Sequence, residues 1–306
     1  MNVTRIRISA LCLLPLLGCD KRPGVQKAAA LADSAVGAVP GAPGAPLRLA
    51  SSAGPIAWLA CEVAGPPCEA VGLVPPGASA HTWEPKPSDL TRLKGVDAWM
   101  RTGLSFEASW TARFQGAFPD MPVLDLRGAL DLKPAETHEH ESHGAETMDP
   151  HVWASPRAMS VLAETLAVRL AAKRPDLTSR IASRMPRVRM HLDSLDALAR
   201  ATLAPWSGRT FLINHPGLGY LARDYGLVQS ALESHGRELS PVALFELRRV
   251  ARAQGIKAVF VQREASDRVA RSVASDLGVP MVSVDLLATP WDSAFRVALQ
   301  SLAQGL

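Results

Sequence analysis

The sequence has little unbalanced charge, few aromatic residues and, after its first residues, no long apolar run. Lysine and arginine number 33 and aspartate and glutamate 29, so the formal net charge is only +4. Proteins that bind nucleic acid usually carry a larger basic excess, and we therefore expect no nucleic-acid partner. No run of about 18 apolar residues follows the N-terminal segment, which predicts no transmembrane helix in the mature protein. The 306 residues, 47% of them apolar, suffice for one large domain or two of average size.

The first residues have the form of an export signal. Arg5 and Arg7 precede the apolar run ISALCLLPLLGC, which is too short to span a bilayer. The run ends in LLGC at residues 16–19, which resembles the lipobox of bacterial lipoproteins. This resemblance implies that Cys19 becomes the lipidated first residue of an exported protein, anchored at the outer face of the cytoplasmic membrane, in the periplasm. We therefore predict a signal peptide at residues 1–19; the alternative is an ordinary apolar start with a chance cysteine.

Cysteine is scarce, and only two cysteines would remain in the body of the mature protein beyond the lipidation site. Of the four in the sequence, Cys12 would leave with the signal peptide, which leaves Cys61 and Cys68. Disulfides form in exported proteins, so we expect a bond between these two. Two free, buried thiols are the alternative.

Short β-like runs alternate with helical stretches along the rest of the chain. The strand candidates are residues 46–52, 69–74, 98–103, 122–126, 208–214, 257–262 and 280–285. This alternation predicts an α/β fold with mostly parallel sheets, and the long amphipathic stretch 177–205 divides it into two blocks. We therefore predict two lobes, each with a parallel sheet flanked by helices, joined by one long helix. The predicted segments are a flexible Pro/Gly-rich tether at 20–47, an N-terminal lobe at 48–172, the connecting helix at 173–204 and a C-terminal lobe at 205–306.

Two Ser-Pro pairs predict where helices begin. Serine is a favoured N-cap, and proline suits the first helical position because its missing N–H is not needed there. Ser155 with Pro156 and Ser240 with Pro241 therefore predict two helix N-termini.

Three histidines and one aspartate occupy similar places in the sequence. His81, His151 and His215 each lie in a loop marked by proline or glycine, near an apolar run. Asp285 ends the apolar run VPMVSVD. Ligands of open α/β sheets bind beyond the carboxyl ends of the strands, so we expect these side chains to meet in the cleft between the lobes.

Three imidazoles and a carboxylate are a ligand set that suits Zn²⁺, which takes four such groups in a tetrahedral shell. Mn²⁺ tolerates mixed nitrogen and oxygen ligands but prefers more oxygen. A single histidine in a loop is more often solvated or part of a turn, and separations of 70 and 64 residues are no local metal signature. By themselves these residues give only a weak indication of a metal site.

The sequence segments around these residues indicate a metal site more strongly. LVPPGASAHTWEPKPSDL, DPHVWASP, NHPGLGYLARDYGL and VPMVSVDLLA resemble, in order, four landmarks of the cluster A-I solute-binding proteins. These ZnuA/TroA-like proteins are the zinc- or manganese-binding subunits of bacterial ABC importers. The resemblance covers residues 48–304. It implies that His81, His151, His215 and Asp285 bind the metal, with no reaction catalysed, and that a monomer passes the ion to a membrane permease driven by a cytoplasmic ATPase.

The segment HEHESHG resembles the histidine-rich loop of many zinc-type members. By that resemblance His138, His140 and His143 could capture zinc transiently; a solvated loop is the alternative. Asp149 could orient a ligating histidine through its other ring nitrogen. His191 and His235 match no ligand of the family and are interpreted as surface or packing residues.

Three other functions stay open from the sequence. A manganese or iron importer subunit would use the same constellation. An exported metallohydrolase would need a general base near an open metal position, and Glu84 is the only carboxylate beside the first ligand motif. An adhesin-like surface lipoprotein is the third, although no separate binding module supports it.

Overall fold

The computed structural model describes residues 46–306 except 76, 136–147 and 235–236. The predicted signal peptide with Cys19, nearly all of the tether, the histidines at 138, 140 and 143, and His235 lie outside the described residues.

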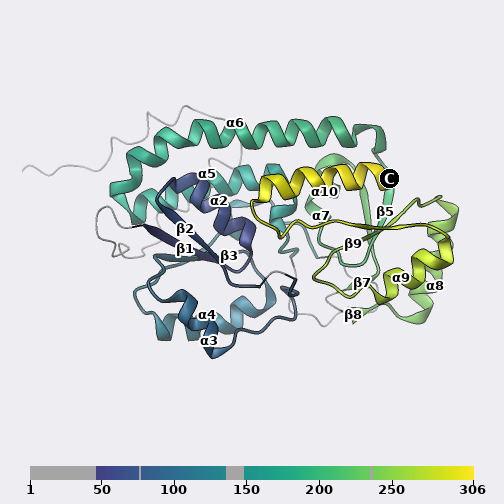
Figure 1. Cartoon of the computed structure of the whole chain (residues 1–306), viewed down its shortest axis with the longest axis horizontal. Helices are drawn as coiled ribbons and strands as arrows, with labels where there is room; N and C mark the ends of the chain where they lie inside the picture. Colours follow the sequence, from purple (N-terminus) through teal and green to yellow (C-terminus); the bar gives the residue numbers. More distant parts are fainter. Residues whose placement is uncertain (1–45, 76, 136–147, 235–236) are drawn as a thin grey trace, which may run out of the picture.

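The first half of the chain forms a parallel sheet with the strand order β2-β1-β3-β4. Its strands are β1 (Leu47–Ser51), β2 (Cys68–Gly72), β3 (Ala98–Arg101) and β4 (Val123–Asp125). The helices α2 (Gly54–Ala64), α3 (Pro87–Leu90) and α4 (Ser105–Ala117) lie between them in the chain. We call this half the N-terminal lobe (Figure 1). β1 and β3 are almost wholly buried, as expected of central strands in a parallel sheet covered on both faces.

The second half forms a parallel sheet of its own, the C-terminal lobe, with the strand order β10-β9-β5-β6. Its strands are β5 (Thr210–Ile213), β6 (Val228–Ala231), β9 (Val259–Val261) and β10 (Met281–Ser283). Its helices are α7 (Gly219–Tyr225), α8 (Pro241–Ala253), α9 (Arg268–Leu277) and α10 (Trp291–Gly305). A small antiparallel pair, β7 (Glu233–Ser234) with β8 (Arg237–Glu238), follows β6. The sequence pattern did not predict β6 or this pair.

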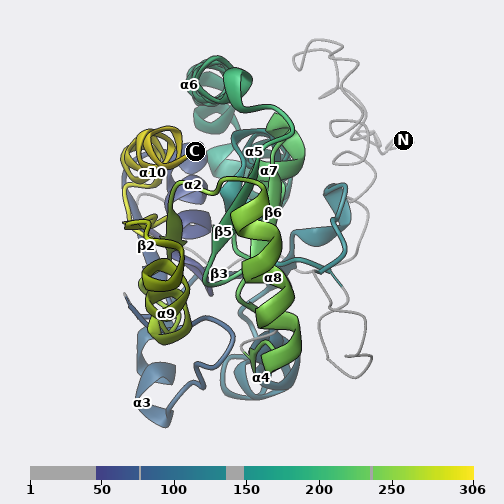
Figure 2. The same cartoon turned by 90° about the vertical axis from the view of Figure 1, so that its right-hand side faces the viewer.

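Two long helices connect the lobes. α5 (Pro156–Lys173) leads into the 26-residue α6 (Thr178–Leu203), with a 3-10 turn at each end of α6. The buried residues of α6 recur every three or four positions, which gives it one apolar face: Ile181, Met185, Val188, Leu192, Leu195, Ala199 and Leu203. That face packs on α5, α2 and α7, and α10 lies beside α6 (Figures 1 and 2). One apolar core therefore runs through both lobes, and the predicted fold class is confirmed.

Both helix starts predicted from Ser-Pro pairs are confirmed. The Ser155 hydroxyl accepts a hydrogen bond from the amide of Arg157 at the start of α5. The Ser240 hydroxyl accepts one from the amide of Ala243 at the start of α8.

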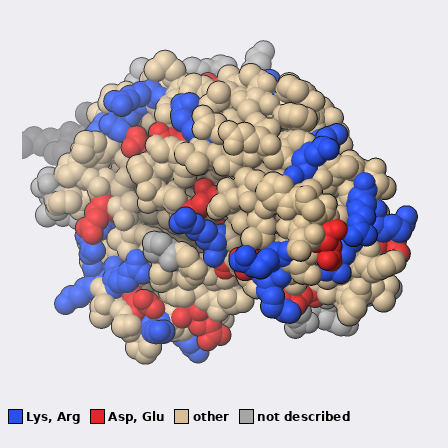
Figure 3. Space-filling view, turned by 45° about the vertical axis from the view of Figure 1, so that its right-hand side comes forward, with Lys and Arg blue, Asp and Glu red and all other residues tan. Residues whose placement is uncertain are grey.

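Charge is mixed on the surface. On the face in Figure 3 acidic side chains lie among the basic ones, and several arginines of the C-terminal lobe are paired, for example Arg271 with Asp267 and Arg249 with Glu246. Among the described residues, no helix is both long enough and apolar enough to cross a bilayer.

Cys61, near the end of α2, and Cys68, the first residue of β2, form a disulfide. The bond closes a short loop between the two elements, with a sequence separation of 7. Its main effect in the chain-entropy description is to restrict the unfolded chain.

Replacing both cysteines by alanine should therefore lower the free energy of unfolding by about 2 kcal/mol. Urea unfolding of the double variant beside the wild type measures the change. A thiol titration of the native, unreduced protein that found both cysteines free would contradict this pairing.

Candidate metal centre

His215 lies just beyond the carboxyl end of β5, in a turn held by its neighbour Asn214. The side-chain oxygen of Asn214 accepts hydrogen bonds from the amides of His215, at 2.9 Å, and of Gln262, at 2.8 Å. Its side-chain nitrogen donates to the carbonyl of Gln262 at 3.1 Å. These bonds fasten the turn to the adjacent strand β9, so His215, only 4% exposed, has a fixed backbone.

His151 lies in the loop that leads into α5, and Asp149 shapes this loop. One carboxylate oxygen, Oδ1, accepts both the amide of His151, at 2.9 Å, and its ring nitrogen Nδ1, at 2.7 Å. Asp149 and His151 are only 4% and 5% exposed. The expectation that Asp149 orients a histidine of the site agrees with these contacts. The edge of the Trp153 ring packs against His151, with ring centroids 5.4 Å apart.

The C-terminal lobe holds the His151 loop in place. The Tyr220 hydroxyl of α7 donates to the carbonyl of Asp149 at 2.9 Å and accepts the amide of Lys133 at 3.2 Å. The indole Nε1 of Trp291, at the start of α10, donates to the carbonyl of Trp153 at 2.9 Å. Although His151 precedes a helix of the first half of the chain, its loop is thereby fixed to the second.

His81 comes from the Pro/Gly-rich loop that precedes α3. Its amide donates to the Ser79 hydroxyl at 3.3 Å, and the amide of Trp83 donates to the Ser79 carbonyl at 2.9 Å. The Trp83 ring packs edge-on against Phe106 of α4, with centroids 4.9 Å apart. The loop is therefore folded back on itself and anchored to the N-terminal lobe. His81 is more exposed than the other two histidines.

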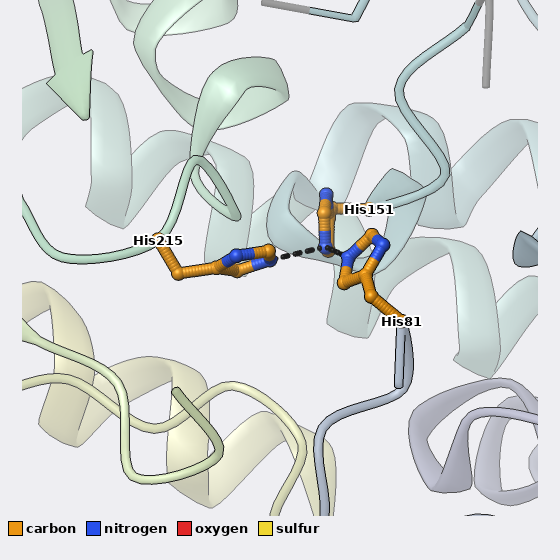
Figure 4. Close-up of side chains that lie close together, drawn as sticks. All are labelled: His81, His151 and His215. Carbon is orange, nitrogen blue, oxygen red and sulfur yellow. Dashed lines mark hydrogen bonds between the residues drawn. The ribbon is translucent and has the colours of Figure 1, made fainter. Parts of the chain in front are cut away.

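The three imidazoles converge on one point (Figure 4). Nε2 of His151 lies 2.9 Å from Nε2 of His81 and 3.0 Å from Nε2 of His215. Two nitrogens bound to one zinc at about 2.0–2.1 Å in a tetrahedral shell would be about 3.3 Å apart. The spacing is thus close to that of a transition-metal shell, and its donors are the imidazoles that such metals take.

Carboxylates lie behind two of these rings. Asp149 accepts Nδ1 of His151, and Glu233 lies 2.6 Å from Nδ1 of His215. Burial, with the charges of His151 and His81, lowers the pKa of His215 well below 6.5 and keeps this imidazole neutral. Burial raises the pKa of Glu233 to about 7; His81 opposes the rise and Glu238 adds to it. A dication held by the imidazoles would favour the ionised carboxylate.

Asp285 lies outside this cluster. In the described part of the chain, the group of three or more residues whose potential ligand atoms all lie within 4.8 Å of one another consists of His81, His151 and His215 and does not include Asp285. Oδ1 of Asp285 instead accepts the amides of Leu287 and Ala288, at 3.0 and 3.1 Å. The role of Asp285 as a fourth ligand stays a prediction.

A second carboxylate, Glu264, follows β9 as Asp285 follows β10. Burial raises the pKa of Glu264 to about 7, the charge of Asp285 adds to the rise, and His81 opposes it. Both carboxylates therefore follow adjacent strands at the same edge of the C-terminal sheet.

Sequence reasoning missed Glu233. Its signal was the pairing of two strands: Ile213 of β5 is opposite Ala231 of β6, and His215 and Glu233 each follow two residues later. Finding this pair required β6, which the composition of VQSA does not suggest.

The two tyrosines of the chain provide a matched test of how the His151 loop is held. Both are buried in α7; Tyr220 bonds to the Asp149 carbonyl and Tyr225 to Asp196 of α6. Tyr220→Phe should weaken metal binding severalfold, up to about tenfold, because the loop loses its support. Each substitution removes one hydrogen bond and should lower the free energy of unfolding by about 1 kcal/mol. Tyr225→Phe should leave the metal affinity unchanged. Equal affinities in competition titrations of the two variants would contradict this view of the loop.

Comparison with known proteins identifies the family. The family model described as zinc-uptake complex component A, periplasmic, matches residues 50–304. The high-affinity zinc uptake system protein ZnuA of Bacillus subtilis is 26% identical over 216 residues, which are 67% of this chain and 67% of that protein. The zinc-binding protein AdcA of Streptococcus pyogenes is 24% identical over 226 residues, which are 68% of this chain but only 44% of AdcA.

Solved structures agree. A crystal structure of ZnuA superimposes with a TM-score of 0.77 and 28% identity, over 85% of this chain and 99% of that one. A zinc-bound ZnuA deletion mutant gives 0.76 with 28% identity, over 85% and 98% of the two chains. FpvC of Pseudomonas aeruginosa, solved with Mn²⁺, shares the fold with a TM-score of 0.73 and 21% identity, over 85% and 98%. The resemblance found in the sequence is confirmed: this chain belongs to the ZnuA family of metal-uptake components, which are binding proteins and not enzymes.

Proposed function

We propose that this protein is the extracytoplasmic solute-binding subunit of an ABC importer, and that it binds Zn²⁺ between its lobes and delivers the ion to a membrane permease. The observation that carries the proposal is the convergence of three imidazole Nε2 atoms, each from a different loop. A cargo ion needs ligands that hold it without performing chemistry on it, and neutral imidazoles do this.

The donor set supports zinc as the cargo. Zn²⁺ binds imidazole nitrogen readily and accepts four ligands, whereas Mn²⁺ prefers shells richer in oxygen. The cluster in the described residues is made of nitrogen alone. The named relatives ZnuA and AdcA are zinc proteins, which points the same way.

Manganese is the second candidate, and one observation favours it. Asp285 and Glu264 follow adjacent strands of the C-terminal lobe, and they are close enough that the charge of Asp285 raises the pKa of Glu264. If Asp285 turned toward the imidazoles as the fourth ligand, the shell would gain the oxygen that Mn²⁺ prefers. The relative solved with Mn²⁺ has the same fold.

Delivery and anchoring complete the proposal. The family model describes a periplasmic component of an uptake complex, so a permease with a cytoplasmic ATPase is the partner we propose. We further propose a lipid anchor at Cys19 that keeps the protein near that permease. We also propose that His138, His140 and His143, which lie outside the described residues, capture zinc transiently.

Affinity should depend on pH, since a protonated imidazole cannot bind metal. The pKa of His215 lies well below 6.5, so protons compete for this ligand only in more acidic solution. We expect a modest fall in affinity as the pH drops through about 7, where Glu233 takes up a proton, and a steeper fall below about pH 6, where histidines are protonated. Titrations against a chromophoric chelator, corrected for the chelator's own protonation, measure this profile. A steep loss between pH 8 and 7 would contradict it.

The proposal is tested by metal content and competitive titration of chelator-stripped protein made without a histidine tag. One tightly bound zinc that manganese cannot displace is the expected result. His81→Ala, His151→Ala or His215→Ala should each weaken binding by more than about 100-fold, because loss of an outer partner alone costs about 10–100-fold.

His191→Ala is the control, since His191 lies on α6 and bonds to Asp292. Asp285→Asn tests whether Asp285 is the fourth metal ligand. Unchanged zinc affinity in this variant would show that it is not. Retention of wild-type affinity by any of the three site variants would refute the assignment.

A further inference from the structure

We propose that Glu233 is a positioning residue for metal binding: it holds the proton of His215 on Nδ1, so that the lone pair of Nε2 faces the metal. This inference rests on the proposed function and adds to it a residue outside the four sequence-predicted ligands. It also gives a function to the short β7–β8 hairpin that carries Glu233.

The fold brings Glu233 and His215 together by strand register. β5 and β6 run parallel, with Ile213 opposite Ala231, and the amide of Leu232 donates to the carbonyl of Ile213 at 2.8 Å. Each functional residue lies two positions beyond the last pair, so both leave the same edge of the sheet side by side. The contact therefore follows from the backbone arrangement and does not depend on a long side chain finding its partner.

The contact itself is short and shielded. Oε1 of Glu233 lies 2.6 Å from Nδ1 of His215, and the two side chains are only 12% and 5% exposed. A charge-assisted hydrogen bond in such a shielded place is stronger than one in water. The neutral histidine side chain in water prefers its proton on Nε2, the nitrogen that faces the other rings here, so the carboxylate reverses the ordinary preference.

His151 repeats the arrangement from a different origin. Asp149, two residues before it, holds its Nδ1 at 2.7 Å. With both protons on Nδ1, the Nε2 atoms of His151 and His215 face each other at 3.0 Å as two acceptors. A metal ion bound by both nitrogens makes this arrangement favourable, so the two carboxylates together prepare the site for its ion.

The hairpin provides a matched control. Glu238 is opposite Glu233 in the β7–β8 pair, but its carboxylate is exposed and pairs with Arg268 at the start of α9. Glu238→Ala therefore removes a carboxylate from the same hairpin without touching a metal ligand.

The first experiment locates the ring proton of His215. The metal-free, ¹⁵N-histidine-labelled protein is studied at about pH 8, well above the ordinary pKa of a histidine, by long-range ¹H–¹⁵N correlation NMR. His215→Gln assigns the signals. We expect Nδ1–H in the wild type and in Glu238→Ala, and a shift toward Nε2–H in Glu233→Ala. Glu233→Gln, whose side-chain oxygen still accepts a hydrogen bond, should keep Nδ1–H.

The second experiment measures zinc affinity by chelator competition in the same proteins. Glu233→Ala should bind about 10–100-fold more weakly, Glu233→Gln should fall between it and the wild type, and Glu238→Ala should stay within about twofold of the wild type. Circular dichroism and thermal unfolding establish that each variant is folded. If Glu233→Ala is not folded, the zinc affinities of Glu233→Gln and Glu238→Ala are compared instead, and equal affinities of these two variants would contradict the inference.

Two results would overturn the inference. One is a Glu233→Ala protein within twofold of wild-type affinity; the other is unchanged His215 tautomer in that variant, since a purely structural loss would weaken binding without moving the proton. Failure of the proposed function is distinguishable from both, because wild-type protein would then bind no zinc while its tautomer could still be read.

Discussion

A neutral imidazole has one ring proton, and its location decides what the other nitrogen can do. In this protein Asp149 and Glu233 each hold the Nδ1 of a buried histidine, which leaves two Nε2 atoms facing each other at 3.0 Å. Neutral acceptors at that distance repel, and burial keeps water from separating them. The arrangement is costly for the empty protein and favourable with a cation at its centre. The fold around it must therefore hold the rings of His151 and His215 against their mutual repulsion.

The lobes are joined in a way that meets this demand. The ligands come from both halves of the chain, yet the His151 loop is hydrogen-bonded to the C-terminal lobe by Tyr220 and Trp291. α6 and the shared apolar core run along both halves, which resists a wide opening. Without these contacts the rings would move apart by a fraction of an ångström, and the site would lose the preorganisation that gives affinity. His81, the most exposed of the three, is held by its own loop and by Trp83 against α4.

Much of this arrangement was readable from the sequence. The alternation of strands and helices predicted two parallel sheets and a long helix, and the Ser-Pro pairs predicted two helix starts, because these features depend on local residue preferences. The three histidines were found because proline and glycine mark their loops and because those loops resemble a known family. Glu233 was missed because β6, VQSA, is short and has little β propensity, and because a partner's identity depends on register between strands. For Asp285 the reverse holds. The sequence motif identified this residue, but the direction of its carboxylate depends on the turn in which it accepts two backbone amides, and that turn could not be predicted from the motif.

The same two carboxylates bear on the choice between zinc and manganese. A buried dication is costly unless nearby negative charge compensates it. Asp149 and Glu233, when ionised, supply two negative charges just behind the ligating rings, so the ion's charge is balanced with no oxygen bound to the metal. Such a site suits zinc, which is stable with few nitrogen ligands. A carboxylate from Asp285 in the shell would make the centre net negative and richer in oxygen, which suits manganese better. Because the three imidazoles are common to both cases, the selectivity of this site depends on what occupies the fourth position.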